Sequence, residues 1–325
     1  MAKAVREHLI KMLAKGEFVS GQEMGNQLAI SRSAISKHIK ALIEMGLDIY
    51  SVTGKGYKLS QPINLLALDQ IINAWPDNET VPEIEVHSLI DSTNSYLLRR
   101  LPNQVSQGQV CLAEFQSAGR GRRGRQWISP FGSQIYLSMY WQLSQGLSAA
   151  MGLSLVTALA VSEAIYVNTN IRVQLKWPND IYLQGVKLAG ILIDLEGQPL
   201  EPSHSVIGIG LNVNMPAQAA KQIDQKWTDI QSHSEQKIDR NSLCAQIIYQ
   251  LVVKLERYQA EGLTTMIDEW NTQDCYLNKR VKLLTGERVT KGICRGVNNQ
   301  GALLLEVDGQ IKPIYGGEVS LRGDE

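Results

Sequence analysis

Cysteine is scarce in this sequence, and neither sign of charge is in excess. The four cysteines, Cys111, Cys244, Cys275 and Cys294, lie far apart and form no C-x-x-C pair. This spacing argues against a structural zinc site and against a disulfide framework, so we expect a cytoplasmic location. Lys and Arg together number 32, as do Asp and Glu, so the total charge marks the chain neither for nucleic acid nor for a membrane surface.

Long apolar segments are also rare. Residues 147–167 are mostly apolar but contain several small polar residues and Glu163, which favours a buried core helix over a membrane span. The N-terminus has no apolar run followed by a small-residue cleavage site, so we expect no signal peptide. A chain of 325 residues that is 44% hydrophobic can instead bury the cores of two or three domains.

The balanced charge hides a basic N-terminal segment. Residues 1–60 contain nine Lys or Arg against five Asp or Glu. Helical spacing predicts helices over residues 3–15 and 21–29 and a third helix capped by Ser31, followed by two strands around a Gly-Lys-Gly turn. This pattern is typical of a winged helix-turn-helix that binds DNA, although a helical unit for protein contacts remains an alternative. The expected DNA-contacting residues are Arg32, Ser33, Ser36, Lys37, Lys40 and Lys55.

The most unusual stretch is residues 116–127, where positions 119–125 hold four arginines and three glycines. Glycine lets the backbone approach a ligand closely, and guanidinium groups donate in pairs to phosphate or carboxylate oxygens. A solvated basic loop or a disordered Gly-Arg segment is the alternative. The flanking residues 110–115 and 135–141 read as core strands, which favours a loop with fixed ends.

Three other polar stretches have both a structural and a functional interpretation. Ser92, Thr93 and Asn94 follow a predicted strand and can cap a helix or bind a polar ligand. Asp180, after the strand 171–176 and a proline, can take part in an Asx turn or bind Mg²⁺. Lys187, in a predicted hairpin over residues 181–193, can extend to water or point into a site as a fixed cation.

The remaining elements complete the predicted organisation. Gly208 and Gly210 in the strand 206–214 leave one face without side chains, so something can approach the backbone there. Asp239 is expected to cap a helix that ends near residue 259, and a second helix covers residues 263–270. Short strands at residues 280–284, 291–297, 302–307 and 310–314 predict a small, closed, SH3-like β-barrel. We expect domains at residues 1–63, 64–275 and 276–325.

Five motifs in this order give the chain a close resemblance to the bifunctional biotin-protein ligases that also repress the biotin operon. The motifs lie at residues 91–94, 116–127, 176–180, 187–192 and 208–212. The resemblance implies an α+β protein: a winged helix-turn-helix, a central mixed sheet with helices like that of class II aminoacyl-tRNA synthetases, and the terminal barrel. It also implies that biotin and ATP give biotinyl-5′-AMP, and that the biotinyl group then passes to a lysine of the biotin carboxyl carrier protein.

The resemblance assigns roles to the motif residues. Arg120, Arg122, Lys187 and Asp180 are the expected catalytic residues, with Asp180 also the expected Mg²⁺ ligand. Trp127 is expected to pack on the adenylate, and Arg322 to reach the nucleotide. The expected residues for binding biotin and ATP are Ser92, Thr93, Asn94, Gln116, Gly119, Arg120, Gly121, Arg122, Trp127, Lys187, Gly208, Gly210 and Asn212.

Biotinyl-5′-AMP is also expected to act as corepressor. Because a Gly-Arg loop is mobile when empty, we expect the adenylate to order it and to build a homodimer surface, which would place two recognition helices on operator DNA. We expect no membrane partner. Two alternatives remain open at this point: a ligase for lipoate or another acid, and a transcription factor whose central domain only senses a small anion.

Overall fold

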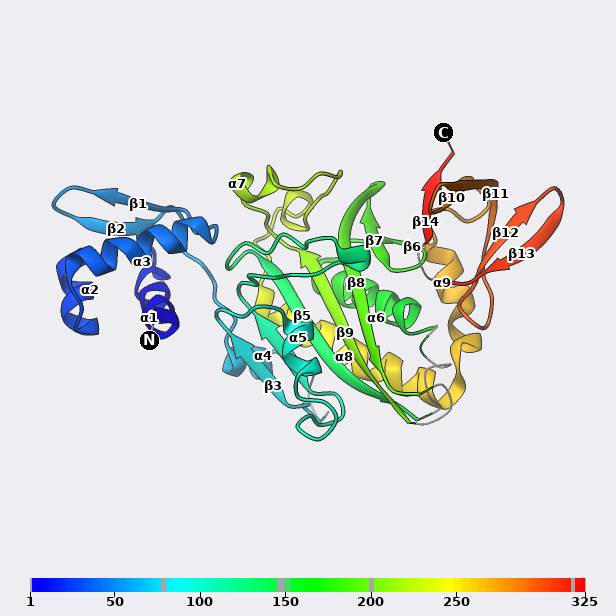
Figure 1. The fold of residues 1–325 in the computed structure, drawn as a ribbon, viewed down its shortest axis with the longest axis horizontal. Helices are drawn as coiled ribbons and strands as arrows, with labels where there is room; N and C mark the ends of the chain where they lie inside the picture. The colour runs from blue at the N-terminus through cyan, green and yellow to red at the C-terminus, as the bar shows by residue number, and fades with distance from the viewer. Residues whose placement is uncertain are drawn as a thin grey trace.

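The chain forms three units in a row, with the central sheet in the middle (Figure 1). The structure is a computed structural model that describes residues 2–76, 80–144, 150, 152–198, 202–316 and 319–324. The helical unit at the N-terminus and the small β unit at the C-terminus lie at opposite ends of the molecule. Within the described residues, every helix is too short or too polar to traverse a lipid bilayer.

The N-terminal unit is the predicted winged helix-turn-helix. Ser20 accepts a hydrogen bond from Glu23 N, and Ser31 accepts one from Ala34 N, so each hydroxyl caps the helix that follows it. Apolar faces of all three helices meet in a separate core that includes Leu9, Met24 and Ile35. The elements are α1 (Ala2–Leu13), α2 (Gly21–Leu28), α3 (Arg32–Glu44), β1 (Ile49–Val52) and β2 (Gly56–Leu59).

The central unit is built on a seven-stranded mixed sheet, which confirms the α+β prediction. Its strand order is β3-β4-β5-β9-β8-β7-β6. Strands β3 and β4 run parallel, and the other described neighbours in this sheet run antiparallel. The strands are β3 (Ile84–His87), β4 (Val110–Ala113), β5 (Gln134–Leu143), β6 (Gln174–Lys176), β7 (Asp180–Leu183), β8 (Val186–Glu196) and β9 (Ser203–Asn212).

Helices pack on both faces of this sheet. The apolar helix α6 (Leu153–Thr169) lies against α8 (Arg240–Glu261), which Asp239 caps as expected. Residues 147–149 and 151 of the predicted apolar helix lie outside the described residues. Ile207 and Ile209 of β9 join the main core, whereas Gly208 and Gly210 alternate onto the face where α5 (Thr93–Leu98) packs. The shorter helices are α4 (Leu68–Asn73), η1 (Arg122–Gly124), α7 (Ala217–Ala220), η3 (Gln231–His233), η4 (Leu263–Met266) and α9 (Ile267–Gln273).

The C-terminal unit is an antiparallel sheet of the SH3-like type, with the order β13-β12-β11-β10-β14. Four strands match those predicted, and β14 is an addition that pairs with β10. Residues 319–321 of β14 line a cavity together with residues of the central unit, so the β14 edge of the sheet faces that unit. The strands are β10 (Arg280–Thr285), β11 (Arg288–Val297), β12 (Leu303–Val307), β13 (Gln310–Ile314) and β14 (Val319–Gly323).

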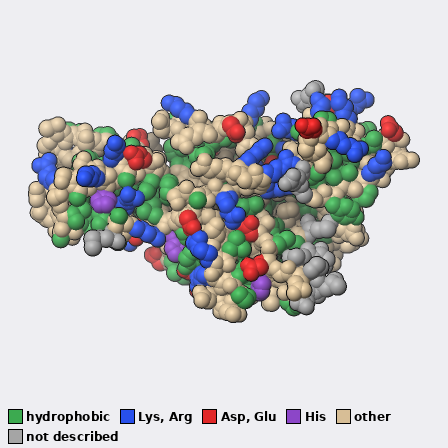
Figure 2. All heavy atoms as spheres, viewed as in Figure 1, with side chains coloured by type: hydrophobic (Ala, Val, Ile, Leu, Met, Phe, Trp, Pro, Cys, Tyr) green, Lys and Arg blue, Asp and Glu red, His purple; other side chains and the backbone are tan. Residues whose placement is uncertain are grey.

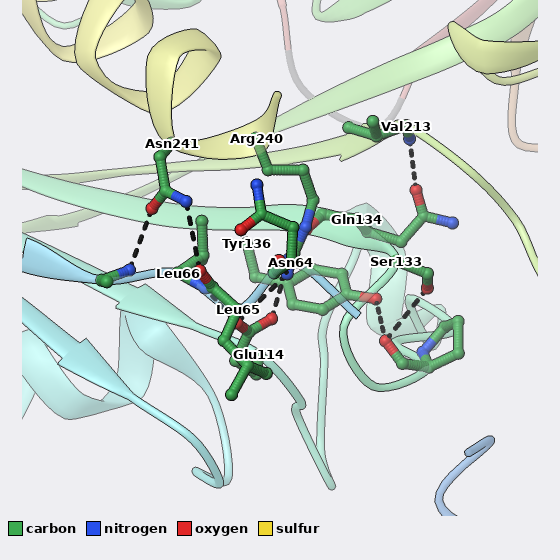
Figure 3. A network of polar contacts seen from close by, with 12 residues as sticks. Asn64, Leu65, Leu66, Glu114, Ser133, Gln134, Tyr136, Val213, Arg240 and Asn241 are labelled. Atoms are coloured by element: carbon green, nitrogen blue, oxygen red, sulfur yellow. Dashed lines mark hydrogen bonds and ion pairs between the residues drawn. The ribbon is translucent and has the colours of Figure 1, made fainter. Parts of the chain in front are cut away.

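A buried ion pair fastens the segment that leaves the winged helix-turn-helix (Figure 3). Arg240 Nη1 lies 2.7 Å from Glu114 Oε2, and both side chains are almost fully buried. Arg240 Nη2 donates to Asn64 O at 2.7 Å, and Leu66 N donates to Glu114 Oε1 at 2.5 Å. The pair thus satisfies backbone groups of the connecting segment while anchoring it to β4 and α8.

Candidate active site

A cavity of about 460 Å³ opens on the α5 face of the central sheet, between the Gly-Arg loop, the β7–β8 hairpin and β14. Figure 2 shows Lys and Arg side chains gathered near the middle of this face of the molecule. All but two of the residues predicted to bind small molecules or ions line it: Ser92, Thr93, Asn94, Gln116, Arg120, Gly121, Arg122, Trp127, Asp180, Lys187, Gly208, Gly210 and Asn212. One exception is Arg322, and the other is Gly119, where a Cβ atom would lie 2.6 Å from Ser129 Oγ, so this glycine serves packing behind the loop.

One end of the cavity is a network of uncharged hydrogen-bonding side chains at the start of α5. Ser92 caps the helix, and Thr93 and Asn94 form its first turn. Thr93 N donates to Gln116 Oε1 at 2.9 Å. Ser138 Oγ lies 2.7 Å from Thr93 Oγ1 and 2.5 Å from Asn94 Oδ1. The capping and binding interpretations of this motif are therefore compatible, because Ser92 caps while Thr93 and Asn94 border the cavity.

The other end carries fixed positive charge. Lys187 Nζ lies 2.7 Å from Asp180 Oδ1, and Lys176 Nζ lies 3.7 Å from Asp180 Oδ2. Lys176 also donates to Tyr182 Oη at 2.8 Å. Burial raises the pKa of Tyr182, which keeps this hydroxyl neutral. Lys187 is thus held against a carboxylate and does not extend to water.

The Gly-Arg loop covers the middle of the cavity, and two of its arginines, Arg120 and Arg122, contact protein groups. Arg120 Nη2 lies 2.8 Å from Asp194 Oδ2, and Arg122 Nη1 donates to Asn179 Oδ1 at 2.9 Å. Burial lowers the pKa of Arg122, although an arginine stays protonated in proteins. The backbone turns at Arg123, which has a φ of 59°.

Trp127 and Asn94 fill the space that the two glycines of β9 leave open. A Cβ atom at Gly210 would lie 2.4 Å from Trp127 Cε2, and one at Gly208 would lie 2.1 Å from Asn94 Oδ1. Lys187 Nζ lies 5.7 Å from the centre of the Trp127 ring. The glycines therefore seat two predicted binding residues against the sheet.

Sequence reasoning missed several residues of the site. Ser138 is fully buried in an apolar strand, and Asp194 lies near the end of β8; neither carries a local signal of function. Residues 222–225, Trp227 and β14 also contribute to the wall, and only the fold brings them there. Arg322, which we expected to reach the nucleotide, does not line the cavity, although its neighbour Leu321 does.

A metal ion in this cavity would need ligands from the phosphate groups of a substrate in addition to protein side chains. No group of three or more His, Cys, Asp or Glu residues that could hold a metal occurs within the part of the chain that the structure describes. Mg²⁺ is commonly held by one or two carboxylates together with substrate phosphates. Asp180 fits that arrangement as the protein carboxylate, next to Lys187.

The predicted DNA-contacting residues form a separate site on the winged helix-turn-helix. All six side chains of this set are exposed, five of them on or beside the outer face of α3 and Lys55 at the wing turn. Lys55 and Lys58 lie over the ring of Phe18 at 5.7 and 5.5 Å from its centroid. The geometry therefore offers one basic helix face and one basic turn for contact with a polyanion.

The two sites are joined through a short segment of chain. Ser129 Oγ accepts from Gln116 Nε2 at 3.2 Å and donates to Trp127 O at 2.9 Å. Two residues further on, Phe131 is buried in the core of the winged helix-turn-helix, and its N–H donates to Met45 O, just past the end of α3. Ser129, which contacts the cavity residues Gln116 and Trp127, thus lies two positions before Phe131, which packs against the winged helix-turn-helix.

Comparison with known proteins identifies the same organisation in relatives. Residues 5–58 match a model described as an HTH domain, residues 86–212 the biotin/lipoate A/B protein ligase family, and residues 276–322 the biotin protein ligase C-terminal domain.

Full-length relatives and a solved structure agree with these matches. The chain is 47% identical over 317 residues to the bifunctional ligase/repressor BirA of Salmonella typhimurium, covering 98% of this chain and 97% of the relative. It is 29% identical to BirA of Bacillus subtilis over 99% of this chain and all of the relative. The biotin protein ligase of Aquifex aeolicus, solved with biotin and ATP, has a TM-score of 0.64 and 30% identity, and covers 75% of this chain and 100% of its own. This chain therefore belongs to the family of bifunctional biotin ligase/repressor proteins.

Proposed function

We propose that this protein activates biotin with ATP to give biotinyl-5′-AMP and diphosphate, and then transfers the biotinyl group to a lysine of a biotin carboxyl carrier protein. The single observation that carries the proposal is the cavity itself. It joins an uncharged hydrogen-bonding end, suited to the biotin head group, to a cationic end suited to a carboxylate and phosphates. Family membership supports the choice of biotin, and the use of ATP is consistent with a cytoplasmic reaction.

The first step needs positive charge rather than a general base. A carboxylate is already ionised near pH 7, and it must approach a triphosphate of the same sign. Lys187, fixed by Asp180 at 2.7 Å, would neutralise the carboxylate. Arg120 and Arg122 would exchange Asp194 and Asn179 for oxygens of the ligand, which stabilises charge that develops at phosphorus. Mg²⁺, brought with ATP and held by Asp180, would offset phosphate charge.

The second step needs access for a macromolecule and protection of the mixed anhydride from water. Trp127, seated on Gly210, would cover the adenylate, while the carrier lysine attacks the acyl carbon and AMP leaves. Positive groups around the leaving phosphate lower the barrier to its departure.

We further propose that the same chain represses a biotin operon. The exposed basic face of α3 and the wing support DNA binding, and the Ser129–Phe131 connection supports communication with the cavity. Biotinyl-5′-AMP would act as corepressor by promoting a homodimer, since two recognition helices are needed for a palindromic operator.

Biotin-dependent exchange of labelled diphosphate into ATP tests the enzymatic proposal. We expect exchange with biotin and much slower exchange with lipoate. Exchange that prefers lipoate would identify a different acyl ligase, and no exchange with either acid would favour a protein that only senses a small anion.

A further inference from the structure

Asp194 makes two contacts that connect opposite sides of the cavity. It lies near the end of β8, is partly buried, and does not itself line the cavity. One carboxylate oxygen, Oδ2, accepts from Asn94 Nδ2 at 2.9 Å and from Arg120 Nη2 at 2.8 Å. A single carboxylate therefore holds both the first turn of α5 and the Gly-Arg loop.

This contact fixes the orientation of the Asn94 amide. A carboxylate only accepts hydrogen bonds, so the NH₂ group of Asn94 must face Asp194. The same NH₂ group donates to Leu192 O at 3.2 Å. Asn94 Oδ1 consequently faces Ser138 Oγ at 2.5 Å, and it packs directly over Gly208.

The fixed amide then sets the direction of the hydrogen bonds beyond it. The Ser138 hydroxyl has one hydrogen, and Asn94 Oδ1 can only accept, so Ser138 must donate to Asn94. Ser138 Oγ also donates toward Thr93 Oγ1 at 2.7 Å, and the Thr93 hydroxyl hydrogen donates to Gln116 Oε1 at 3.2 Å. Gln116 Oε1 also accepts from Thr93 N at 2.9 Å. Each group in this chain therefore has a defined donor or acceptor side.

We propose that Asp194 is a positioning residue for binding of the biotin head group. It sets the donor and acceptor pattern that Asn94, Thr93 and Gln116 present to the ligand, through the buried Ser138 behind them. The contact with Asn94 is the decisive one, because Asn94 is 4% exposed, whereas the Arg120 side chain is 43% exposed and its ion pair is screened by solvent. The inference rests on the proposed function, since it takes biotin as the ligand of this end of the cavity.

The substitution Asp194→Asn in the full-length protein tests this proposal. It keeps the shape of the side chain but lets an NH₂ group face Asn94, so the orientation of the Asn94 amide, and with it the direction of the hydrogen bonds beyond it, is no longer fixed. We expect the affinity for biotin, measured by isothermal titration calorimetry without ATP, to fall roughly 10- to 100-fold. In exchange assays the KM for biotin should rise, while kcat and the KM for ATP stay close to those of the wild type.

A matched control and a double-mutant cycle separate this effect from general damage. Glu196 lies two residues further along β8 with an exposed side chain, so Glu196→Gln should bind biotin like the wild type. Ser138→Ala interrupts the same series of hydrogen bonds. The losses of biotin-binding free energy caused by Ser138→Ala and Asp194→Asn should therefore be less than additive in the double variant, whereas those of Asp194→Asn and Glu196→Gln should be additive. If Asp194→Asn does not fold, Asp194→Ser, which also removes the carboxylate, serves in its place.

The outcomes distinguish this inference from the proposed function. Wild-type protein that does not bind biotin contradicts the proposed function itself. Biotin binding by the wild type, together with a carboxylate-removing variant that binds within about twofold of it, overturns only the role of Asp194. Full additivity between Asp194→Asn and Ser138→Ala would likewise show that Asp194 does not act through the chain.

Discussion

Arg122 links the Gly-Arg loop to the β7–β8 hairpin through Asn179. Its partial burial and its place in the cavity lining make it the loop arginine best placed to hold the adenylate. We predict that Arg122→Gly releases biotinyl-5′-AMP about 10- to 100-fold faster, because it removes a charged hydrogen-bond donor and loosens the turn.

Release of labelled adenylate from the purified complex measures this effect. Arg122→Lys should recover part of the retention, since it restores charge without the paired donors. Equal retention by the wild type and Arg122→Gly would exclude the loop from holding the intermediate.

The two glycines of β9 allow the two ends of the cavity to be tested separately. A Cβ atom at Gly208 would collide with Asn94, and one at Gly210 with Trp127. We predict that Gly208→Ala raises the KM for biotin and Gly210→Ala the KM for ATP, each roughly tenfold, because the displaced side chain serves a different substrate.

Diphosphate-exchange kinetics, with the biotin and ATP concentrations varied in turn, measure the two KM values separately. Gly316→Ala is the control, since a Cβ atom there meets nothing within 4 Å. The assignment of the two ends fails if both variants change the same KM.

At the scale of single residues, the sequence predicted those that belong to a recognisable motif. Arg122, Lys187 and Asn94 stand in motifs whose chemistry can be read locally, and the structure brings them to one cavity. Ser138 and Asp194 could not be predicted in the same way. A serine in an apolar strand and an aspartate near a strand end are ordinary, and only the pairing of β5, β8 and β9 brings them to Asn94.

At the scale of elements, the buried pair of Glu114 and Arg240 deserves the most direct test, because it joins the connecting segment, β4 and α8. We predict that Glu114→Gln lowers the free energy of unfolding by about 3–5 kcal/mol, since it leaves the Arg240 charge buried without its partner.

Urea unfolding of the full-length protein measures that change. Glu269→Gln removes the partner of Lys254 in a pair that is more exposed, and it should cost only about 0–1 kcal/mol. A similar loss of unfolding free energy in the two variants would show that burial does not increase the contribution of the Glu114–Arg240 pair to stability.

Helices and strands with a clear periodicity of apolar residues could be predicted, whereas elements that depend on pairing with segments far away in the sequence could not. Helices α3 and α8 follow from apolar spacing and from the caps Ser31 and Asp239. Strand β14 was missed because five residues that contain a serine, an arginine and a glycine carry little strand signal. Its pairing with β10, about 40 residues earlier in the chain, supplies the order that its own sequence lacks.

At the scale of the whole molecule, the DNA-binding unit and the cavity lie in different units that share the Trp127–Phe131 segment. Phe131 is buried in the core of the winged helix-turn-helix, so a change in the position of Trp127 on binding adenylate has a short route to α3. This route links two sites, but a monomer has only one recognition helix, and a palindromic operator needs two.

We therefore predict that biotin and ATP together convert the protein from monomer to dimer, and that neither alone does so fully. Arg120 and Arg122 are paired with protein groups in this structure, and the adenylate would draw both away and reorganise the loop surface. Sedimentation and operator-binding measurements with each ligand combination check this. Lys37→Ala with Lys40→Ala should weaken DNA binding and leave both the dimer and the adenylate intact, because these side chains are exposed on α3. A protein that stays monomeric with both ligands yet binds operator more tightly would show that the signal passes within one chain, through Phe131, without a second subunit.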